Sequence, residues 1–425
     1  NGTITFTDAG NLNLFSAVTD LGTLSTTNGT VTYDGVDQVV FSDIYYSLTA
    51  GGASGTKTLG GNVTVANDFT IDTDVTIAMD THLLTVTNVT DIDGTLAVAD
   101  NTLTLDGTSD IDGTITISTG TVDANDTFDA TNGTITFSDA GNLNLFSAVT
   151  DLGTLSTTNG TVTYDGVDQV VFSDIYYSLT AGGASGTKTL GGNVTVANDF
   201  TIDTDVTIAM DTHLLTVTNV TDIDGTLAVA DNTLTLDGTS DIDGTITIST
   251  GTVDANDTFD ATNGTITFSD AGNLNLFSAV TDLGTLSDNF GTVTYDGVDQ
   301  VVFSDIYYSL TAGGGSGTKT LGGNVTVAND LTIDIDVTIS MNTHLLTVTN
   351  VTDIDGTLAV AGDTLTLDGT SDIDGTITIS TGTVDANGAF DATNGTITFT
   401  DAGNLNLFSA VTDLGTLSTT NGTVT

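Results

Sequence analysis

Two nested repeats constrain this chain more than any other feature of its sequence. The string Asn-Gly-Thr-Ile-Thr-Phe begins at Asn1, Asn132, Asn263 and Asn394, which sets a long period of 131 residues. The first two copies differ at one position, where Thr7 is replaced by Ser138. A chain of such close copies uses one folding scheme repeatedly, as solenoids, propellers and tandem arrays do.

A shorter period of about 20 residues runs inside each copy. Apolar residues recur in three columns, which are Leu84, Leu103, Val122 and Leu143; Ile77, Val98, Ile117 and Phe137; and Ile71, Ile92 and Ile111. Three columns that advance together indicate three strands per coil, each paired with its counterpart one coil later.

The segments around these columns have the composition of short strands. They are rich in Thr and Val and alternate with period two, as in 114–117, while Gly, Asn and Asp lie between them. Pro is absent, which leaves every interior backbone N–H available to a ladder. The sequence therefore predicts an all-β parallel β-solenoid with about 20 residues and three short strands per coil. A tandem immunoglobulin-like β-sandwich fits the long period but not the short one, because sandwich strands are not copies of one another.

The repeats define the expected organisation of the chain. We expect solenoid repeats at 1–131, 132–262 and 263–393 and a partial fourth at 394–425, joined in one continuous rod. Paired strands lie ~4.8 Å apart, so about six coils give ~29 Å of rise per copy. Because the chain begins at Asn1 without an initiator Met or a leader, we expect it to be part of a longer protein.

Composition excludes two classes of partner. The formal net charge is −52, and the only basic side chains besides histidine are Lys57, Lys188 and Lys319. Nucleic acids and anionic membranes both need cationic contacts, so we expect neither as a partner. At 38% hydrophobic residues the chain can still bury a core, although no window is apolar enough for a membrane helix. The absence of Cys excludes a disulfide-stapled fold.

One segment, residues 31–59, breaks the short period. It contains Tyr33, Phe41, Tyr45 and Tyr46, followed by a Gly/Ser-rich run at 49–56. We interpret the run as a flexible surface loop whose base is covered by the aromatic side chains. The loop is either a recognition site that recurs in every repeat or a simple spacer, and both interpretations stay open.

The string Asp-Ile-Asp-Gly-Thr occurs at 91–95 and 110–114, one short period apart. If Ile92 and Ile111 point into the core, the flanking carboxyl groups point outward and stack between coils. Stacked carboxylates either raise a pKa or attract a cation, and Ca²⁺ prefers such oxygen ligands. The candidate calcium ligands are Asp91, Asp93, Asp110 and Asp112. The alternative is structural, with exposed strand ends beside turn glycines, because the EF-hand pattern is absent.

Asn-x-Ser/Thr sequences are candidate sites of N-glycosylation on an extracellular surface. In the first copy they begin at Asn1, Asn28, Asn62, Asn88 and Asn125, and Asn132 opens the second copy. The third copy loses two of them, because Phe290 replaces Asn28 and Ala389 replaces Thr127. Glycosylation of those two sites in every copy is therefore not required.

We expect no enzyme activity. His82 and its copies, His213 and His344, have no Cys, Glu or second His nearby, so a place at a coil corner fits them better than catalysis. The columns of outward Thr, with Thr114 and Thr116 stacked on Thr134 and Thr136 and with Thr95 and Thr23, are similar to ice-binding faces. Ala97 and Ser25 interrupt that array, and Thr is in any case a favoured residue on a wet strand face.

The segment 45–71, which contains Gly-Thr-Lys-Thr-Leu followed by paired strands, resembles the repeats of large bacterial surface proteins and adhesins. The resemblance covers about 30 residues per copy and implies secretion, cell-surface attachment and a stalk or fibre role. The secretion and sorting segments of such proteins are not in the sequence, which puts attachment in doubt.

The expected function is that of an extracellular structural protein, the shaft of a filament, stalk or giant adhesin. The expected partners are copies of the chain itself, joined end to end through open sheet edges, or the continuation of a longer chain. The alternatives are an adhesin repeat that binds calcium or glycan and, less directly, an ice-binding solenoid.

Overall fold

The computed structural model describes residues 2–52, 54–183, 185–287, 289–418 and 420–425. The chain is all-β and folds as a parallel β-solenoid of about 22 turns, with about 19 residues per turn and three strands per coil. The predicted fold class is confirmed, with a coil slightly shorter than expected. Among the described residues there is no helix of the length and hydropathy that a membrane span requires.

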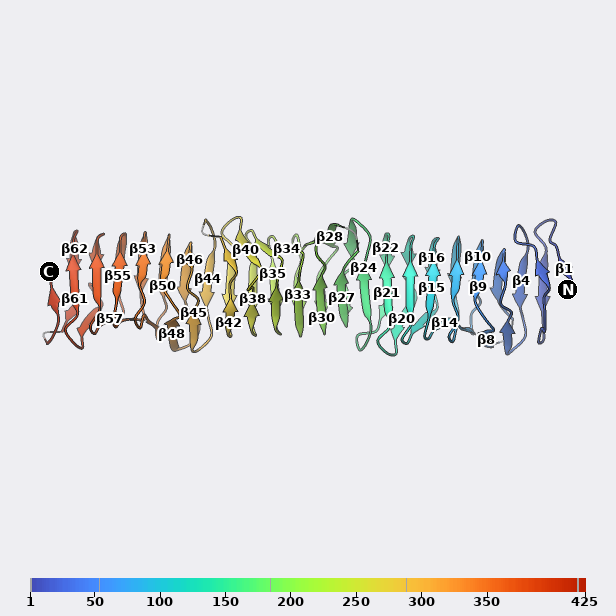
Figure 1. Cartoon of the computed structure of the whole chain (residues 1–425), viewed down its shortest axis with the longest axis horizontal. Coiled ribbons are helices and arrows are strands. Elements are labelled where there is room, and N and C mark those ends of the chain that lie inside the picture. Colours follow the sequence, from blue (N-terminus) through green and yellow to red (C-terminus); the bar gives the residue numbers. More distant parts are fainter. Residues whose placement is uncertain (1, 53, 184, 288, 419) are drawn as a thin grey trace. The chain divides into compact units, whose positions relative to one another are not determined.

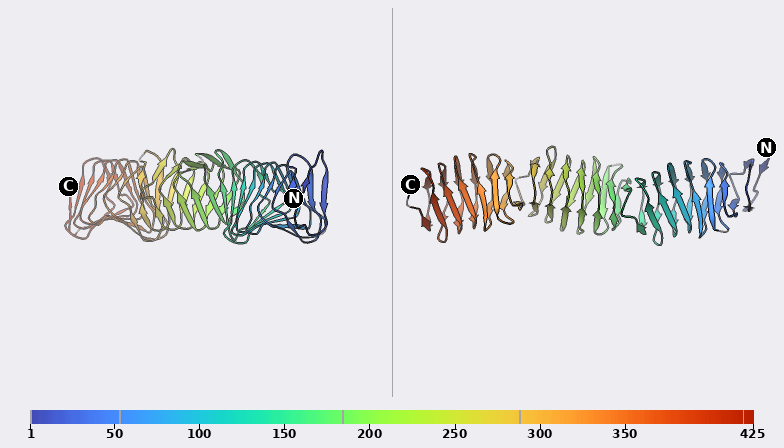
Figure 2. Two further views of the ribbon diagram at one scale, coloured as in Figure 1. Left: turned by 45° about the vertical axis from the view of Figure 1, so that its right-hand side comes forward. Right: turned by 90° about the horizontal axis from the view of Figure 1, so that it is seen from below.

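Two compact units divide the chain, Asn1–Ile208 (unit 1) and Ala209–Thr425 (unit 2). Their boundary does not coincide with an end of a 131-residue repeat, since unit 1 contains all of the first copy and more than half of the second. Within each unit the strands stack side by side in chain order (Figures 1 and 2).

Three faces of parallel strands make up the coils of unit 1. The first face consists of β2 (Asn11–Leu14), β4 (Thr30–Tyr33), β7 (Ser47–Ala50), β10 (Asp68–Ile71), β13 (Val89–Ile92), β16 (Ser109–Ile111), β19 (Phe128–Asp129) and β22 (Val149–Asp151). The second face consists of β5 (Gln38–Val40), β8 (Gly55–Leu59), β11 (Val75–Ala78), β14 (Thr95–Val98), β17 (Thr114–Ile117), β20 (Thr134–Phe137) and β23 (Thr154–Leu155). The third face begins with β6 (Ile44–Tyr45), β9 (Val63–Val65), β12 (Leu84–Val86), β15 (Thr102–Leu105), β18 (Thr121–Ala124) and β21 (Asn142–Leu145), and β1 (Thr3–Ile4) pairs with β3 (Thr23–Leu24).

The same strands recur with the long period. Strands β4 to β23 are repeated one period later as β24 (Thr161–Tyr164) to β43 (Thr285–Leu286), and two periods later as β44 (Thr292–Tyr295) to β63 (Thr416–Leu417). The one difference in bounds is β56 (Thr370–Ile373), which is one residue longer than its counterparts, and β64 (Thr423–Val424) opens the next period. Each 131-residue repeat therefore contributes 20 strands, from β4 to β23 in the first case.

Twenty strands are six coils of three strands with two strands left over, so each repeat ends one strand short of a full turn. In unit 1, β4 stacks on β2 on the first face, whereas its counterpart β24 stacks on β21 on the third face. In unit 2, β33 (Val220–Ile223) and its counterpart β53 (Val351–Ile354) likewise belong to different ladders. Corresponding residues of successive repeats in one unit thus lie on different faces, as Figure 1 shows for β8 at the lower edge and β28 (Gly186–Leu190) at the upper edge.

The register between coils confirms two of the three predicted columns. Ile71 pairs with Ile92 and Ile92 with Ile111, and the column from Leu84 to Leu143 also pairs as expected. The column through Ile77 and Val98 is wrong at that step, because Ile77 pairs with Leu96. The local step is 19 residues rather than 21, since β11 and β14 are joined by a shorter connection than the average period assumes.

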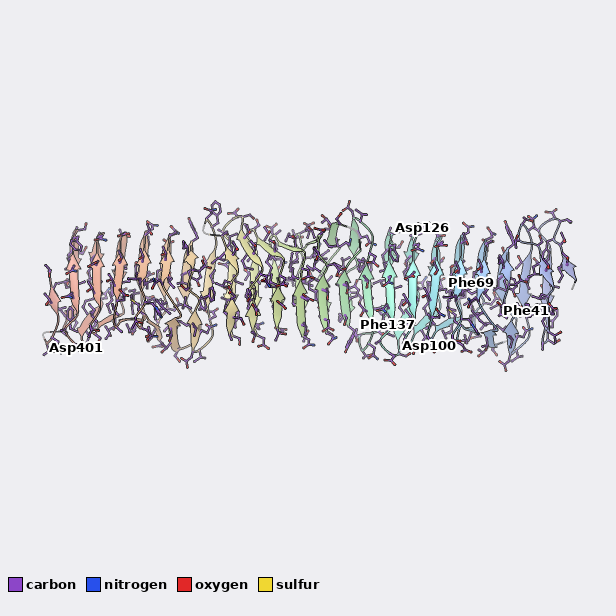
Figure 3. The ribbon with its side chains drawn as sticks, in the orientation of Figure 1. Phe41, Phe69, Asp100, Asp126, Phe137 and Asp401 are labelled. Carbon is purple, nitrogen blue, oxygen red and sulfur yellow. The ribbon has the colours of Figure 1, made fainter. Side chains whose placement is uncertain are left out.

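The core is formed by the inward half of each strand. Ile71, Ile92 and Ile111 are fully buried, and the replacement of Phe69 by Leu331 in the third copy conserves a buried apolar position. Phe69 lies inside the ribbon, whereas Asp100 and Asp126 lie at its two edges (Figure 3). Burial of a large apolar side chain stabilises the fold by about 1.5–3 kcal/mol, so a core of stacked Ile, Leu and Val is the main source of stability.

Several bends between strands are tight enough to require Gly. At Gly113, between β16 and β17, an added Cβ would lie 2.0 Å from the carbonyl oxygen of Gly94 in the coil before. Gly113 N–H also donates to the carbonyl of Ile92, so the two coils touch backbone to backbone there. The predicted turn glycines are thus needed for close approach between coils, and not for a positive φ.

We predict that Gly113→Ala destabilises the coils around β16 and β17 by about 1–3 kcal/mol, because the methyl group forces the two backbones apart. Thermal unfolding and amide hydrogen exchange in 109–117 would measure the effect. Gly315→Ala is the matched control, because nothing lies within 4 Å of its added Cβ and the first two copies carry Ala at that position. Equal exchange rates in the two variants would contradict the prediction.

Candidate functional site

An open groove recurs once per repeat and is the best-formed concave surface of the chain. In the second repeat its volume is about 880 Å³, and it is lined by Phe146, Ser147, Ala148, Val149, Val167, Asp168, Gln169, Val170, Thr187 and Thr189. Corresponding residues form grooves of about 410 Å³ in the first repeat, from Ala17 to Thr58, and about 490 Å³ in the third, from Phe277 to Val301. We call each of these surfaces the groove.

The groove crosses three successive coils. Its lower wall is the segment 146–149 and its floor is β25 (Gln169–Val171) with the bend before it. Its upper wall is formed by the outward threonines of β28. Because side chains alternate along a strand, Val170 points outward between the inward Gln169 and Val171.

Apolar side chains in the groove are unusually exposed. Phe146 is 40% exposed, Val167 is 55% exposed and Val170 is 57% exposed. Their counterparts in the other two repeats, including Val39 and Val301, are exposed to a similar or larger extent. Single exposed apolar residues are ordinary, but a cluster in a concave surface is typical of an interaction site.

A buried glutamine holds the floor and the lower wall together. The Gln169 Oε1 accepts a hydrogen bond from Gly166 N at 2.7 Å. Its Nε2 donates to the carbonyls of Leu145 at 2.9 Å and Ser147 at 2.7 Å. The same bonds are made by Gln38 and Gln300, so each groove has a glutamine that fixes the backbone of two coils.

A buried lysine holds the floor to the upper wall. Lys188 pairs with Gln169 across the ladder and points into the core, where its Nζ donates to the carbonyls of Gly166 and Val167. Burial lowers the pKa of Lys188, an effect that the nearby carboxylates of Asp165 and Asp168 oppose. Lys57 and Lys319 are buried in the same way, so none of the three lysines reaches the surface.

Two buried tyrosines fill the interior beside this cluster. In the first repeat the Tyr33 and Tyr45 hydroxyls lie 2.9 Å apart, and their rings pack edge to face. Tyr45 OH donates to the carbonyl of Phe41 at 2.6 Å, and Phe41 N donates to Tyr33 OH at 2.9 Å, so Tyr33 donates to Tyr45. Burial raises the pKa of the second repeat's Tyr164 to about 12.

The interpretation of 49–56 as a flexible loop with aromatics at its base is wrong. Ser47–Ala50 and Gly55–Leu59 are strands β7 and β8, joined by a short bend in which Ala53 lies outside the described residues. Tyr33 and Tyr45 are inside the core and do not cover a loop. The signal that could have located the groove is compositional, since all Lys, Gln and Tyr residues of the chain fall in 33–57 and its two copies.

The predicted stack of carboxyl groups exists, but only in part. Asp91 pairs with Asp110 across the ladder, and Asp110 pairs with Asp129. Asp93 and Asp112 lie beyond the ends of β13 and β16, in the bends that follow, where Asn132 Nδ2 donates to Asp112 Oδ1 at 3.1 Å. Over the part of the chain that the structure describes, no group of three or more His and Asp side chains is placed to hold a metal ion. Calcium binding by these four residues stays a prediction.

Burial and mutual repulsion both act on these carboxyl groups. Partial burial raises the pKa of Asp91, and the charges of Asp93, Asp110 and Asp112 raise it further. The pKa of Asp110 is raised for the same reasons, with Asp112 first among the neighbouring charges. The stack therefore disfavours its own ionised form at neutral pH.

The candidate glycosylation sites lie mainly at exposed bends. Asn62, Asn88, Asn125 and Asn132 are exposed, Asn28 is half-buried, and Asn1 lies outside the described residues. Several of these side chains bond to the adjacent coil, as Asn125 Nδ2 does to Asp106 Oδ1 at 2.7 Å. Phe290, which replaces Asn28 in the third copy, packs against Tyr308. Glycosylation itself stays a prediction.

The remaining sequence features are placed as follows. His82 lies at the corner between β11 and β12, as expected, with its N–H donating to the carbonyl of Met79. On the second face of unit 1, Thr56, Thr76, Thr95, Thr114, Thr134 and Thr154 form an unbroken column. Thr23 pairs with Thr3 in a separate ladder, so its expected place in the column of Thr114 is wrong.

Comparison with protein-family models, curated proteins and solved structures found no match. The functional inference therefore depends on the chain's own residues, and the resemblance to adhesin repeats stays a prediction.

We predict that Gln169→Leu destabilises the second groove by about 1–3 kcal/mol, because the near-isosteric side chain leaves Gly166 N and two carbonyls without their partner. The measurement is amide exchange of 145–149 and 165–170, with thermal unfolding as the global readout. Val170→Thr, a change on the exposed side of the same strand, serves as the control. Unchanged exchange in Gln169→Leu would show that the glutamine does not hold the walls.

We predict that the chain becomes more stable as the pH falls from about 7 to about 4. A carboxyl group with a raised pKa in the folded state stabilises it fully below the ordinary Asp pKa, and that contribution is lost as the pH rises through the folded value. Thermal midpoints measured at low protein concentration would test this. Asp91→Asn should raise the midpoint at neutral pH and reduce its pH dependence, and a midpoint that falls steadily on acidification would contradict the prediction.

Proposed function

We propose that the chain is a structural protein, the shaft of an extracellular filament, stalk or adhesin, and not an enzyme. The observation that carries this proposal is that the ladder runs through a repeat boundary without interruption. In unit 1, β18 of the first copy pairs with β21 of the second, which pairs in turn with β24. Successive copies therefore share one core there, in contrast to bead-like modules joined by linkers.

Such a ladder supports a spacer function for a physical reason. Each added coil extends the unit by ~4.8 Å and pairs along all three faces, so length increases without a new fold. Neighbouring repeats cannot rotate independently where their strands are hydrogen-bonded. The acidic surface, with all lysines buried, keeps such chains hydrated and apart from one another.

A second candidate is a binding repeat of an adhesin, and the groove is the observation that favours it. Calcium or glycan binding at the Asp stack is the less supported form of this candidate, because the described carboxyl groups do not converge on one point. Ice binding by the column of Thr on the second face predicts thermal hysteresis, whose absence would exclude it.

The shaft proposal predicts a fixed distance between corresponding points of successive repeats. The chain lacks cysteine, so Thr73→Cys and Thr204→Cys, both at exposed bends of unit 1, provide a specific pair for spin labels. We expect one narrow distance distribution, with an axial separation of ~32 Å for nearly seven coils at the usual strand spacing. The same pair in concentrated guanidinium gives the broad reference, and an equally broad distribution under native conditions would refute a stiff shaft.

The location of the protein needs a separate test. Antibodies against this chain, applied to intact and to permeabilised cells that produce it, should label the outside of intact cells or material extending from them. Labelling that requires permeabilisation would overturn the extracellular part of the proposal.

A further inference from the structure

The groove combines features of a built site with those of an open surface. Its backbone is fixed from below by Gln169 and Lys188, whose residue types occur nowhere in the chain except beneath a groove. Its exposed side is apolar and rigid, since Val167 lies in the bend that Lys188 holds and Val170 lies in a paired strand. A surface that is held rigidly but left uncovered is suited to an incoming side chain.

Charge narrows the class of partner. Asp168 lines the groove, where its Oδ1 accepts a hydrogen bond from Thr187 N at 2.9 Å, and a carboxylate can accept further donors. The chain as a whole carries a formal net charge of −52, so a cationic partner is attracted and an anionic one is repelled. A second copy of the chain does not fit, because its lysines are buried and its surface is acidic.

We propose that each groove is a docking site for a segment of a different protein in which an apolar side chain, preferably aromatic, is flanked by lysine or arginine. The apolar side chain packs against Phe146, Val167 and Val170, and a flanking cation bonds to Asp168. The groove volumes of about 410 to 880 Å³ are in the range of sites that hold one or two large side chains. This inference does not depend on the shaft function, because it concerns binding by the chain in solution.

The test uses the full 425-residue chain and short fluorescent peptides. The probe is Gly-Lys-Phe-Lys-Gly, and its two controls are Gly-Lys-Ser-Lys-Gly, which lacks the aromatic ring, and Gly-Glu-Phe-Glu-Gly, which reverses the charge. Fluorescence polarisation should show binding of the probe that is about tenfold or more tighter than that of either control. Equal binding of the two Lys peptides would overturn the proposal, because it would indicate attraction by charge alone.

A groove variant and a matched surface variant locate the binding. The groove variant carries Phe146→Ser and Val170→Thr with the same changes at Phe15, Val39, Phe277 and Val301. The surface variant carries Ile44→Thr, Ile175→Thr and Ile306→Thr, at side chains that are 50%, 50% and 48% exposed and do not line a groove. We expect affinity to fall about tenfold or more in the groove variant and to change less than about twofold in the surface variant.

A photoreactive form of the probe keeps the proposal testable if the groove variant fails to fold. Cross-linking to the unmodified chain, followed by peptide mapping, should find the adduct in 146–149, 167–170 or their counterparts. Adducts confined to other segments, or equal affinity of the groove variant and the unmodified chain, would overturn the proposal. So would binding of neutral oligosaccharides, but not of the peptide probe, that is lost in the groove variant.

Discussion

The parallel hydrogen-bonded ladder between coils is the interaction on which the rest of the structure depends. It places each residue directly against its counterpart one coil away, so the properties of one position are multiplied along the unit. Ile above Ile gives a continuous core, and Gly above Gly lets two backbones touch. Asp above Asp gives repulsion that a globular fold would avoid. Favourable and unfavourable contacts alike are therefore set by register.

The groove shows how a regular ladder is adapted to make an irregular surface. Most inward positions are apolar, but at each groove an inward Gln and an inward Lys follow one another in the same column. A buried cation is costly unless its donors are satisfied, and here backbone carbonyls of the adjacent coil satisfy them. The outward side of the same coils remains available for contact. Polar groups inside thus fix apolar groups outside, which reverses the usual arrangement of a strand.

Much of the fold could be predicted because the sequence repeats itself at the coil period. The column of Ile71, Ile92 and Ile111 needed only the spacing of apolar residues. The error at Ile77 arose because coils differ by one or two residues, and an average period cannot locate where a connection shortens. The groove was missed because a Gly-rich run with a Lys is typical of a loop. Alternation alone would have placed Lys57 inward between Thr56 and Thr58, but only coordinates show the carbonyls that accept its hydrogen bonds.

The mismatch of 20 strands per repeat with three strands per coil has a consequence for display. Within unit 1 the grooves of the first and second copies open on different sides, about a third of a revolution apart, and are separated by nearly seven coils. Two bulky molecules held at these points would not collide, and neither would shield the other. A tandem array built on this rule distributes its attachment points as a spiral staircase, which offers a contact to whatever approaches from any direction.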